Sequence, residues 1–167
     1  ENLLYLGTGT GRILELLGPR ARRGTGIDLS REMLSVARAN LERAGRGNCH
    51  VRQGDLYQLS FPGDAFDAVT IHQVLHFLDE PGRAIAEAAR VLRPGGRLLI
   101  VDFAPHDLES LRQVHEHRRL GFTEAEINAW FGRAGLTPKD TASLTGAPLT
   151  VVLWLAEKPL PDTGLEP

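Results

Sequence analysis

Short apolar runs alternate with amphipathic stretches along the first two thirds of this chain. Five runs of apolar and β-branched residues read as buried strands: Leu3–Leu6, Gly24–Leu29, Cys49–Arg52, Phe66–Ile71 and Arg97–Asp102. Between them, apolar residues recur at helical spacing, as in Met33, Ala37 and Leu41. Strands that alternate with helices predict a mostly parallel sheet with helices on both of its faces.

Capping residues and breakers set the expected helix boundaries. We expect a first helix over Arg12–Leu17 and a second that begins after Ser30, a natural N-cap. Asp79 or Glu80 caps a third helix, with Pro81 in its first turn. A polar helix is expected over 106–119, and the capping box at 123–126 opens another that runs to Gly135.

The last two predicted strands, Thr137–Thr141 and Leu149–Ala156, are separated by a loop that is too short for a helical crossover. The final strand should therefore run antiparallel to its neighbours. The expected fold is a doubly wound α/β, Rossmann-like, mostly parallel seven-stranded sheet with an antiparallel final strand. We expect one domain over 1–158 and a disordered tail over 159–167.

Candidate chemistry gathers at the ends of the predicted strands. Gly7, Gly9 and Gly11 follow the first strand, and alternating glycines of this kind let a ligand lie against bare backbone. Asp28 ends the second strand about 20 residues on, where dinucleotide-type sites place the acid that binds ribose hydroxyls. Asp55 follows the third strand and His72 the fourth. The spacing G-x-G-x-G differs from the dinucleotide fingerprint, and the turn lacks the lysine of a P-loop.

Five successive segments resemble the motifs of class I S-adenosylmethionine-dependent methyltransferases, in particular the small-molecule branch of the ubiquinone/menaquinone type. They are LLYLGTGTGR, GIDLS, QGDLYQL, FDAVTIHQVLHFL and VLRPGGRLLIVDF. A sixth, DFAPHDLESLRQVHEHRRLGF, resembles methyltransferase domains fused to bacterial ArsR-type repressors. The chain departs from the family at Tyr5, where an Asp or Glu usually helps to hold the cofactor's amino group.

The resemblance implies S-adenosylmethionine as cofactor, S-adenosylhomocysteine as product and a small-molecule methyl acceptor. The residues implied as cofactor contacts are Gly7, Thr8, Gly9, Gly11, Asp28, Leu29, Asp55, Leu56 and His72. The glycine turn would wrap the methionine half, Asp28 the ribose, and Asp55 with Leu56 the adenine. Asp28 as a helix cap and Asp55 as a turn former are the simpler alternatives.

His72 and Gln73 are our candidates for catalysis, with His72 as a general base or an orienting group. A surface or helix-start histidine is the alternative for His72, and a structural role is favoured for His76. His115 and His117 are two residues apart, so they would diverge on a helix, and we expect no metal site. Arg118 and Arg119 are expected to face solvent rather than an anionic acceptor.

Composition narrows the remaining possibilities. The chain has 167 residues, a net charge of −2 and a single cysteine, Cys49. These features argue against a nucleic-acid surface, a disulfide framework and the thiolate set needed for arsenite methylation. No run reaches the ~18 apolar residues of a membrane span, and no signal peptide is visible. We therefore expect a cytoplasmic bacterial protein, with homodimerisation as a further possibility.

Two other functions stay open at this stage. The domain is alternatively the sensor of S-adenosylmethionine or S-adenosylhomocysteine in an ArsR-type regulator, with a DNA-binding domain upstream and little turnover. A nicotinamide-dependent oxidoreductase is the third hypothesis, against which the glycine spacing counts. Because the chain begins directly at a core strand, we expect it to be a piece of a longer protein.

Overall fold

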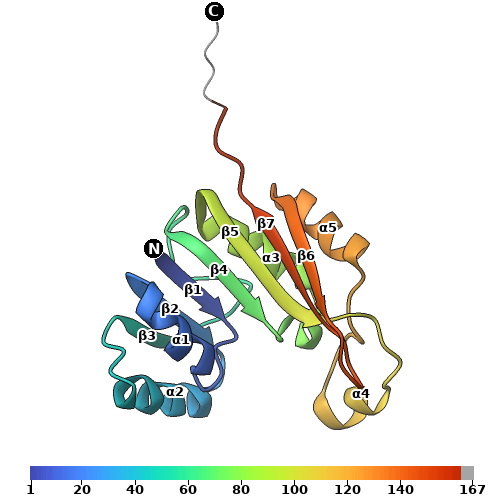
Figure 1. Cartoon of the computed structure of the whole chain (residues 1–167), viewed down its shortest axis with the longest axis horizontal. Coiled ribbons are helices and arrows are strands. Elements are labelled where there is room, and N and C mark those ends of the chain that lie inside the picture. The colour runs from blue at the N-terminus through green and yellow to red at the C-terminus, as the bar shows by residue number, and fades with distance from the viewer. Residues whose placement is uncertain (163–167) are drawn as a thin grey trace, which may run out of the picture.

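A computed structural model describes residues 1–162 and shows a seven-stranded sheet in the order β3-β2-β1-β4-β5-β7-β6 (Figure 1). The strands are β1 (Asn2–Leu6), β2 (Arg23–Asp28), β3 (Cys49–Gln53), β4 (Phe66–His72), β5 (Leu92–Phe103), β6 (Thr137–Leu144) and β7 (Val151–Glu157). The first five are parallel, and β7 lies antiparallel between β5 and β6. The predicted fold class and the antiparallel final strand are confirmed.

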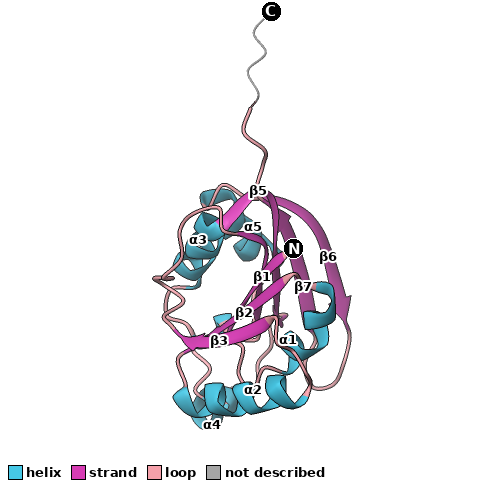
Figure 2. Cartoon of the chain, turned by 90° about the vertical axis from the view of Figure 1, so that its left-hand side faces the viewer, coloured by secondary structure: helices cyan, strands magenta, loops and turns pink. Residues whose placement is uncertain are grey.

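Helices cover both faces of the sheet (Figure 2). The helices of the described residues are α1 (Arg12–Leu17), η1 (Gly18–Arg20), α2 (Arg31–Arg43), η2 (Leu75–Phe77), α3 (Pro81–Val91), α4 (Ser110–His115) and α5 (Glu124–Arg133). The smaller core cluster joins α1 and α2 to one face through Tyr5, Leu14 and Leu34. The larger cluster packs α3 and α5 on the other face, around Ile85, Phe131 and Trp154.

The expected caps form as local chemistry predicts. Ser30 Oγ accepts a hydrogen bond from Met33 N at 3.2 Å and begins α2. Thr123 and Glu126 form the reciprocal capping box of α5, in which each side chain bonds the other's backbone N–H. Glu80 is the N-cap residue of α3, without a side-chain bond, and Pro81 occupies the first turn.

The largest differences from the predicted boundaries are in α4 and β5. The polar helix expected over 106–119 is only Ser110–His115, and none of its residues is buried. Without an apolar stripe to pack, this stretch has little to stabilise a longer helix. Strand β5 begins at Leu92 rather than Arg97, because Leu92 already pairs with Phe66 of β4. Gly95 N also donates to the carbonyl of Lys158, just after β7, at 2.7 Å. Of the expected tail, residues 163–167 lie outside the described residues.

Candidate functional site

The glycine turn after β1 has the backbone that only glycine adopts without strain. Gly7, Gly9 and Gly11 have φ values of 75°, 52° and 77°. The amides of Gly7 and Thr8 both donate to Ile27 O, at 2.9 and 3.0 Å, which ties the turn to β2. A Cβ on Gly9 would meet nothing within 4 Å, so the turn is open at its middle glycine. The hydroxyl of Thr8 is buried beside it without a hydrogen-bond partner among the described residues.

Asp28 ends β2 beside this turn and is bonded to it. Its Oδ2 accepts from Gly9 N at 2.8 Å, and its Oδ1 accepts from Ser30 N at 3.0 Å. Each carboxylate oxygen retains acceptor capacity, which suits it to hydroxyl donors of a ribose. Leu29 follows with 61% of its surface exposed. The carboxylate therefore shapes the turn and also presents negative charge beside it.

Asp55 and Leu56 lie after β3, in a turn whose geometry Asp55 supports. Asp55 Oδ1 accepts from Tyr57 N at 2.8 Å, which is the turn-forming bond that the alternative predicted. Asp55 is exposed, but the Leu56 side chain is only 4% exposed and belongs to the larger core cluster. The Asp55 carboxylate is thus accessible, whereas the Leu56 side chain is enclosed in the core.

His72 is the last residue of β4, and Gln73 follows in a left-handed conformation with φ 51°. Such a backbone is uncommon outside glycine and is held here by the bond from Gln73 N to Val101 O at 2.7 Å. The His72 ring lies 6.1 Å from the Tyr5 ring, centroid to centroid. Partial burial lowers the pKa of His72, against an opposing effect of Asp102, so the ring is mainly neutral at pH 7.

The topology brings these residues to one edge of the sheet. Parallel strands β3, β2, β1, β4 and β5 end on the same side, so the glycine turn, Asp28, Asp55 and His72 follow neighbouring strand ends. This carboxyl edge is where open α/β sheets bind ligands. The open glycine cradle and the carboxylate beside it fit an adenosyl cofactor with a polar tail.

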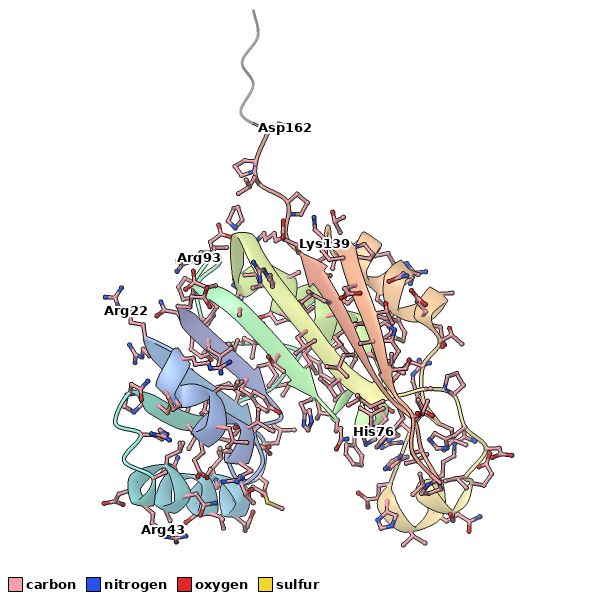
Figure 3. All side chains as sticks on the ribbon, in the orientation of Figure 1. Arg22, Arg43, His76, Arg93, Lys139 and Asp162 are labelled. Atoms are coloured by element: carbon pink, nitrogen blue, oxygen red, sulfur yellow. The ribbon has the colours of Figure 1, made fainter. Side chains whose placement is uncertain are left out.

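The sequence did not predict one buried, hydrogen-bonded pair of side chains at this edge. His76, in η2 after β4, lies 2.7 Å from Asp102 of β5, measured from Nδ1 to Oδ1, and both residues are fully enclosed. Figure 3 shows His76 at the carboxyl end of the sheet, where the β4 and β5 ribbons end. The available signal was that His76 follows one predicted strand and Asp102 ends the next, although the two residues are 26 positions apart.

The two candidate arginines of the following segment are already engaged. Arg118 lies 3.5 Å from Asp79, and the Arg119 guanidinium lies over the Trp130 ring at 5.5 Å. His115 is exposed at the end of α4, whereas His117 lies outside that helix and is buried, so, contrary to the prediction, the two do not share a helix. Within residues 1–162, no three His, Cys, Asp or Glu side chains are arranged to hold a metal ion.

Comparison with known proteins decides the family. A family model described as a methyltransferase domain matches residues 4–100. The chain belongs to the class I S-adenosylmethionine-dependent methyltransferases. S-adenosylmethionine is accordingly its cofactor, and the chain's resemblance to this family is confirmed.

Relatives and a solved structure agree with this assignment. The chain is 38% identical over 115 residues to phosphatidylethanolamine N-methyltransferase of Cereibacter sphaeroides, covering 68% of this chain and 56% of that protein. It is 35% identical to the ubiquinone/menaquinone biosynthesis C-methyltransferase UbiE of Vibrio parahaemolyticus, covering 70% of this chain and 46% of that protein. The crystal structure of YcgJ from Bacillus subtilis superposes on this chain with a TM-score of 0.84 at 23% sequence identity. The superposition covers 96% of this chain and 92% of YcgJ.

The chain spans about half the length of the curated relatives that it matches. Those relatives are named as methyltransferases, and they lend no support to the hypothesis of a repressor's sensor domain. Among the helices of residues 1–162, none has the length and apolar character that a membrane span requires.

Proposed function

We propose that this domain transfers a methyl group from S-adenosylmethionine to a small-molecule acceptor at the carboxyl edge of the sheet. The observation that carries the proposal is the bond between Asp28 and Gly9, which joins a carboxylate to an open glycine turn. When bound, the cofactor supplies an activated methyl group. The work of the chain is to hold it, to orient the acceptor and to take up a proton where the acceptor loses one.

We assign the cofactor contacts along the strand ends. Gly7, Thr8, Gly9 and Gly11 would surround the methionine half, because they form the turn that follows β1, where Gly9 leaves open space. Asp28 and Leu29 would bind the ribose, with the carboxylate accepting from its hydroxyl groups. Asp55, with the backbone of Leu56, would meet the adenine amino group. Each assignment rests on the placement of these residues after adjacent strands.

In this proposal His72 takes up the proton, and Gln73 orients the molecule that receives the methyl group. The lowered pKa of His72 supports the role, because a ring that is neutral at pH 7 has a free lone pair. Its half-buried position leaves one side open to a ligand, whereas His76 is enclosed.

Calorimetric titration with S-adenosylmethionine and with S-adenosylhomocysteine tests the proposal. We expect both to bind, and we expect Asp28→Ala to weaken each by about 1–3 kcal/mol, the usual effect of losing polar partners. Asp140→Ala, an exposed carboxylate on the distant edge strand β6, is the matched control and should bind as the wild type does. Absence of binding to both ligands would contradict the proposal. Binding of S-adenosylhomocysteine alone would favour the sensor hypothesis.

Turnover is then measured as release of S-adenosylhomocysteine in the presence of a panel of phenols, quinols and amines. His72→Gln should lower the rate by about 10²-fold or more if the ring is a general base, and leave cofactor affinity nearly intact. An equal loss of affinity would instead make His72 a cofactor contact.

A further inference from the structure

The segment 104–121 joins β5 to α5 and reaches past the carboxyl ends of β4 and β5, with α4 at its far end (Figure 1). No residue of α4 is buried. Within the described residues 104–121, His117 is the only one that is buried. A segment with so little apolar burial has little to hold it to the domain, so its position depends on the few contacts made by His117 and its neighbours.

The backbone turns sharply to bring His117 inward. Glu116 ends α4 with φ 56°, a left-handed conformation, and His117 N donates to Leu111 O at 3.2 Å. The His117 ring then lies on the His76 ring, with centroids 4.1 Å apart and planes tilted by 34°. The Phe77 ring packs edge-on against the His117 ring, with 5.1 Å between the two centroids.

His76 binds the segment through its carbonyl as well as its ring. His76 O accepts from Arg118 N at 2.8 Å and from Arg119 N at 3.1 Å. The ring itself is fixed by Asp102, 2.7 Å from Nδ1, and that carboxylate is fully buried. His76 and Asp102 therefore form a rigid surface against which His117 packs.

This packing suits a neutral His117 and opposes a charged one. Nδ1 of His117 is buried and has no hydrogen-bond partner among the described residues, so a proton on it would be poorly solvated. Burial lowers the pKa of His117, and the neighbouring His76 lowers it further, while Asp102 opposes the shift.

The other charged groups around His117 come from the segment and from η2. His106 and His115 add to the lowering of its pKa. Arg112, Glu116 and Arg118 line the same hollow of about 430 Å³ at the rim, and Arg118 is paired with Asp79. Among the residues described, Asp102 is the only carboxylate that counters a charge on His117 from within the core, and His76 lies between as its hydrogen-bond partner.

We propose that His117 is a proton-sensitive latch that holds the segment 104–121 against the His76–Asp102 pair when neutral and releases it when protonated. The direction follows from the packing: docking is fully stabilised above the pKa of an undocked histidine and is lost as pH falls below it. Since this segment borders the strand ends at which we place the cofactor, release would loosen the acceptor side of the site. The latch itself is a property of the free protein and does not depend on the proposed catalysis.

The test is hydrogen exchange followed by mass spectrometry on the full chain without ligand, from about pH 7.5 to about pH 5. Protection factors are corrected for the intrinsic pH dependence of exchange. We expect peptides covering 110–121 to lose protection several-fold on acidification, reversibly, while peptides of α3 keep theirs. His117→Phe preserves an aromatic ring on His76 but cannot be protonated, so its protection should not change with pH. His50→Gln removes an exposed histidine of β3 and should behave as the wild type does.

A second measurement uses the unmodified protein in case His117→Phe does not fold. The proton resonances of the His117 ring should titrate with the same midpoint as the loss of protection. Protection that is independent of pH, a midpoint that differs from that of His117, or an unchanged pH dependence in His117→Phe would each overturn the latch.

Discussion

The hydroxyl of Tyr5 leads to a prediction whose sign runs against the usual effect of core substitutions. Tyr5 is 1% exposed, in the cluster between the sheet and α1 and α2, and its hydroxyl has no hydrogen-bond partner among the described residues. A buried hydroxyl without a partner costs about 1–3 kcal/mol of desolvation. Tyr5→Phe removes this cost and leaves only the volume of one oxygen atom unfilled.

We therefore expect Tyr5→Phe to raise the free energy of unfolding by about 1 kcal/mol. With a urea m-value of about 2 kcal/mol/M, the midpoint should rise by roughly 0.5 M. The measurement is urea unfolding followed by circular dichroism, with the m-value checked for equality between the variants. Tyr57→Phe is the matched control, because Tyr57 Oη accepts from Glu80 N at 3.1 Å, and its loss should destabilise by about 0.5–1.5 kcal/mol.

A destabilised Tyr5→Phe would refute this reasoning, because it would show that the hydroxyl is hydrogen-bonded in the folded protein. Calorimetry on the same variant adds a functional readout. If the stability rises while the affinity for S-adenosylmethionine falls, the hydroxyl is held unpaired for the cofactor, in the position where the family usually has an acid.

Further predictions concern alkaline pH, the segment before α5 and the glycine turn. Burial raises the pKa of the Tyr5 phenol, so the phenol ionises more readily in the unfolded chain than in the folded one. The free energy of unfolding should therefore fall as pH rises beyond about 10, the pKa of an unfolded tyrosine. Unfolding measured at about pH 9 and pH 11 should show this loss in the wild type and not in Tyr5→Phe. Gly121→Ala should lower the free energy of unfolding by about 3 kcal/mol or more, because its Cβ would lie 2.1 Å from Ala104 O at a φ of +83°. Thermal or urea unfolding measures this loss. Gly132→Ala in α5 is the control, because its Cβ has open space around it, and it should be neutral or stabilising. Asp28→Asn, which keeps one acceptor oxygen, should bind S-adenosylmethionine more tightly than Asp28→Ala in the same titration, and equal affinities would remove Asp28 from the ribose role.

Local chemistry explains what could be predicted from the sequence. The glycine turn, the N-cap at Ser30 and the capping box at Thr123 each depend on residues within a few positions of one another. The direction of β7 followed from the short loop before it. In these places the conformation is decided by the turn itself, so no knowledge of distant packing was needed.

The segment after β5 could not be predicted in the same way. Its polar sequence suggested a helix over 106–119, but α4 stops at His115, where Glu116 adopts a left-handed conformation. The burial of His117 depends on His76 and Asp102, which lie 41 and 15 residues earlier in the chain. Pattern analysis of an exposed helix therefore missed a buried contact that only the tertiary structure creates.

His72 and His76, four residues apart at the end of β4, lie in different environments. His76 has Asp102 on one ring nitrogen, His117 across its ring face and two backbone amides on its carbonyl, so almost none of it can meet a ligand. His72 is half-buried, has no charged hydrogen-bond partner among the described residues and is kept mainly neutral by its lowered pKa. A ring that must exchange protons with an acceptor needs access and a free lone pair, and His72 has both. The carboxyl edge thus holds one enclosed histidine and one accessible histidine, and the accessible one is the residue that we propose as the proton acceptor. Asp102 acts on both: it bonds the His76 ring directly and opposes the lowering of the His72 pKa.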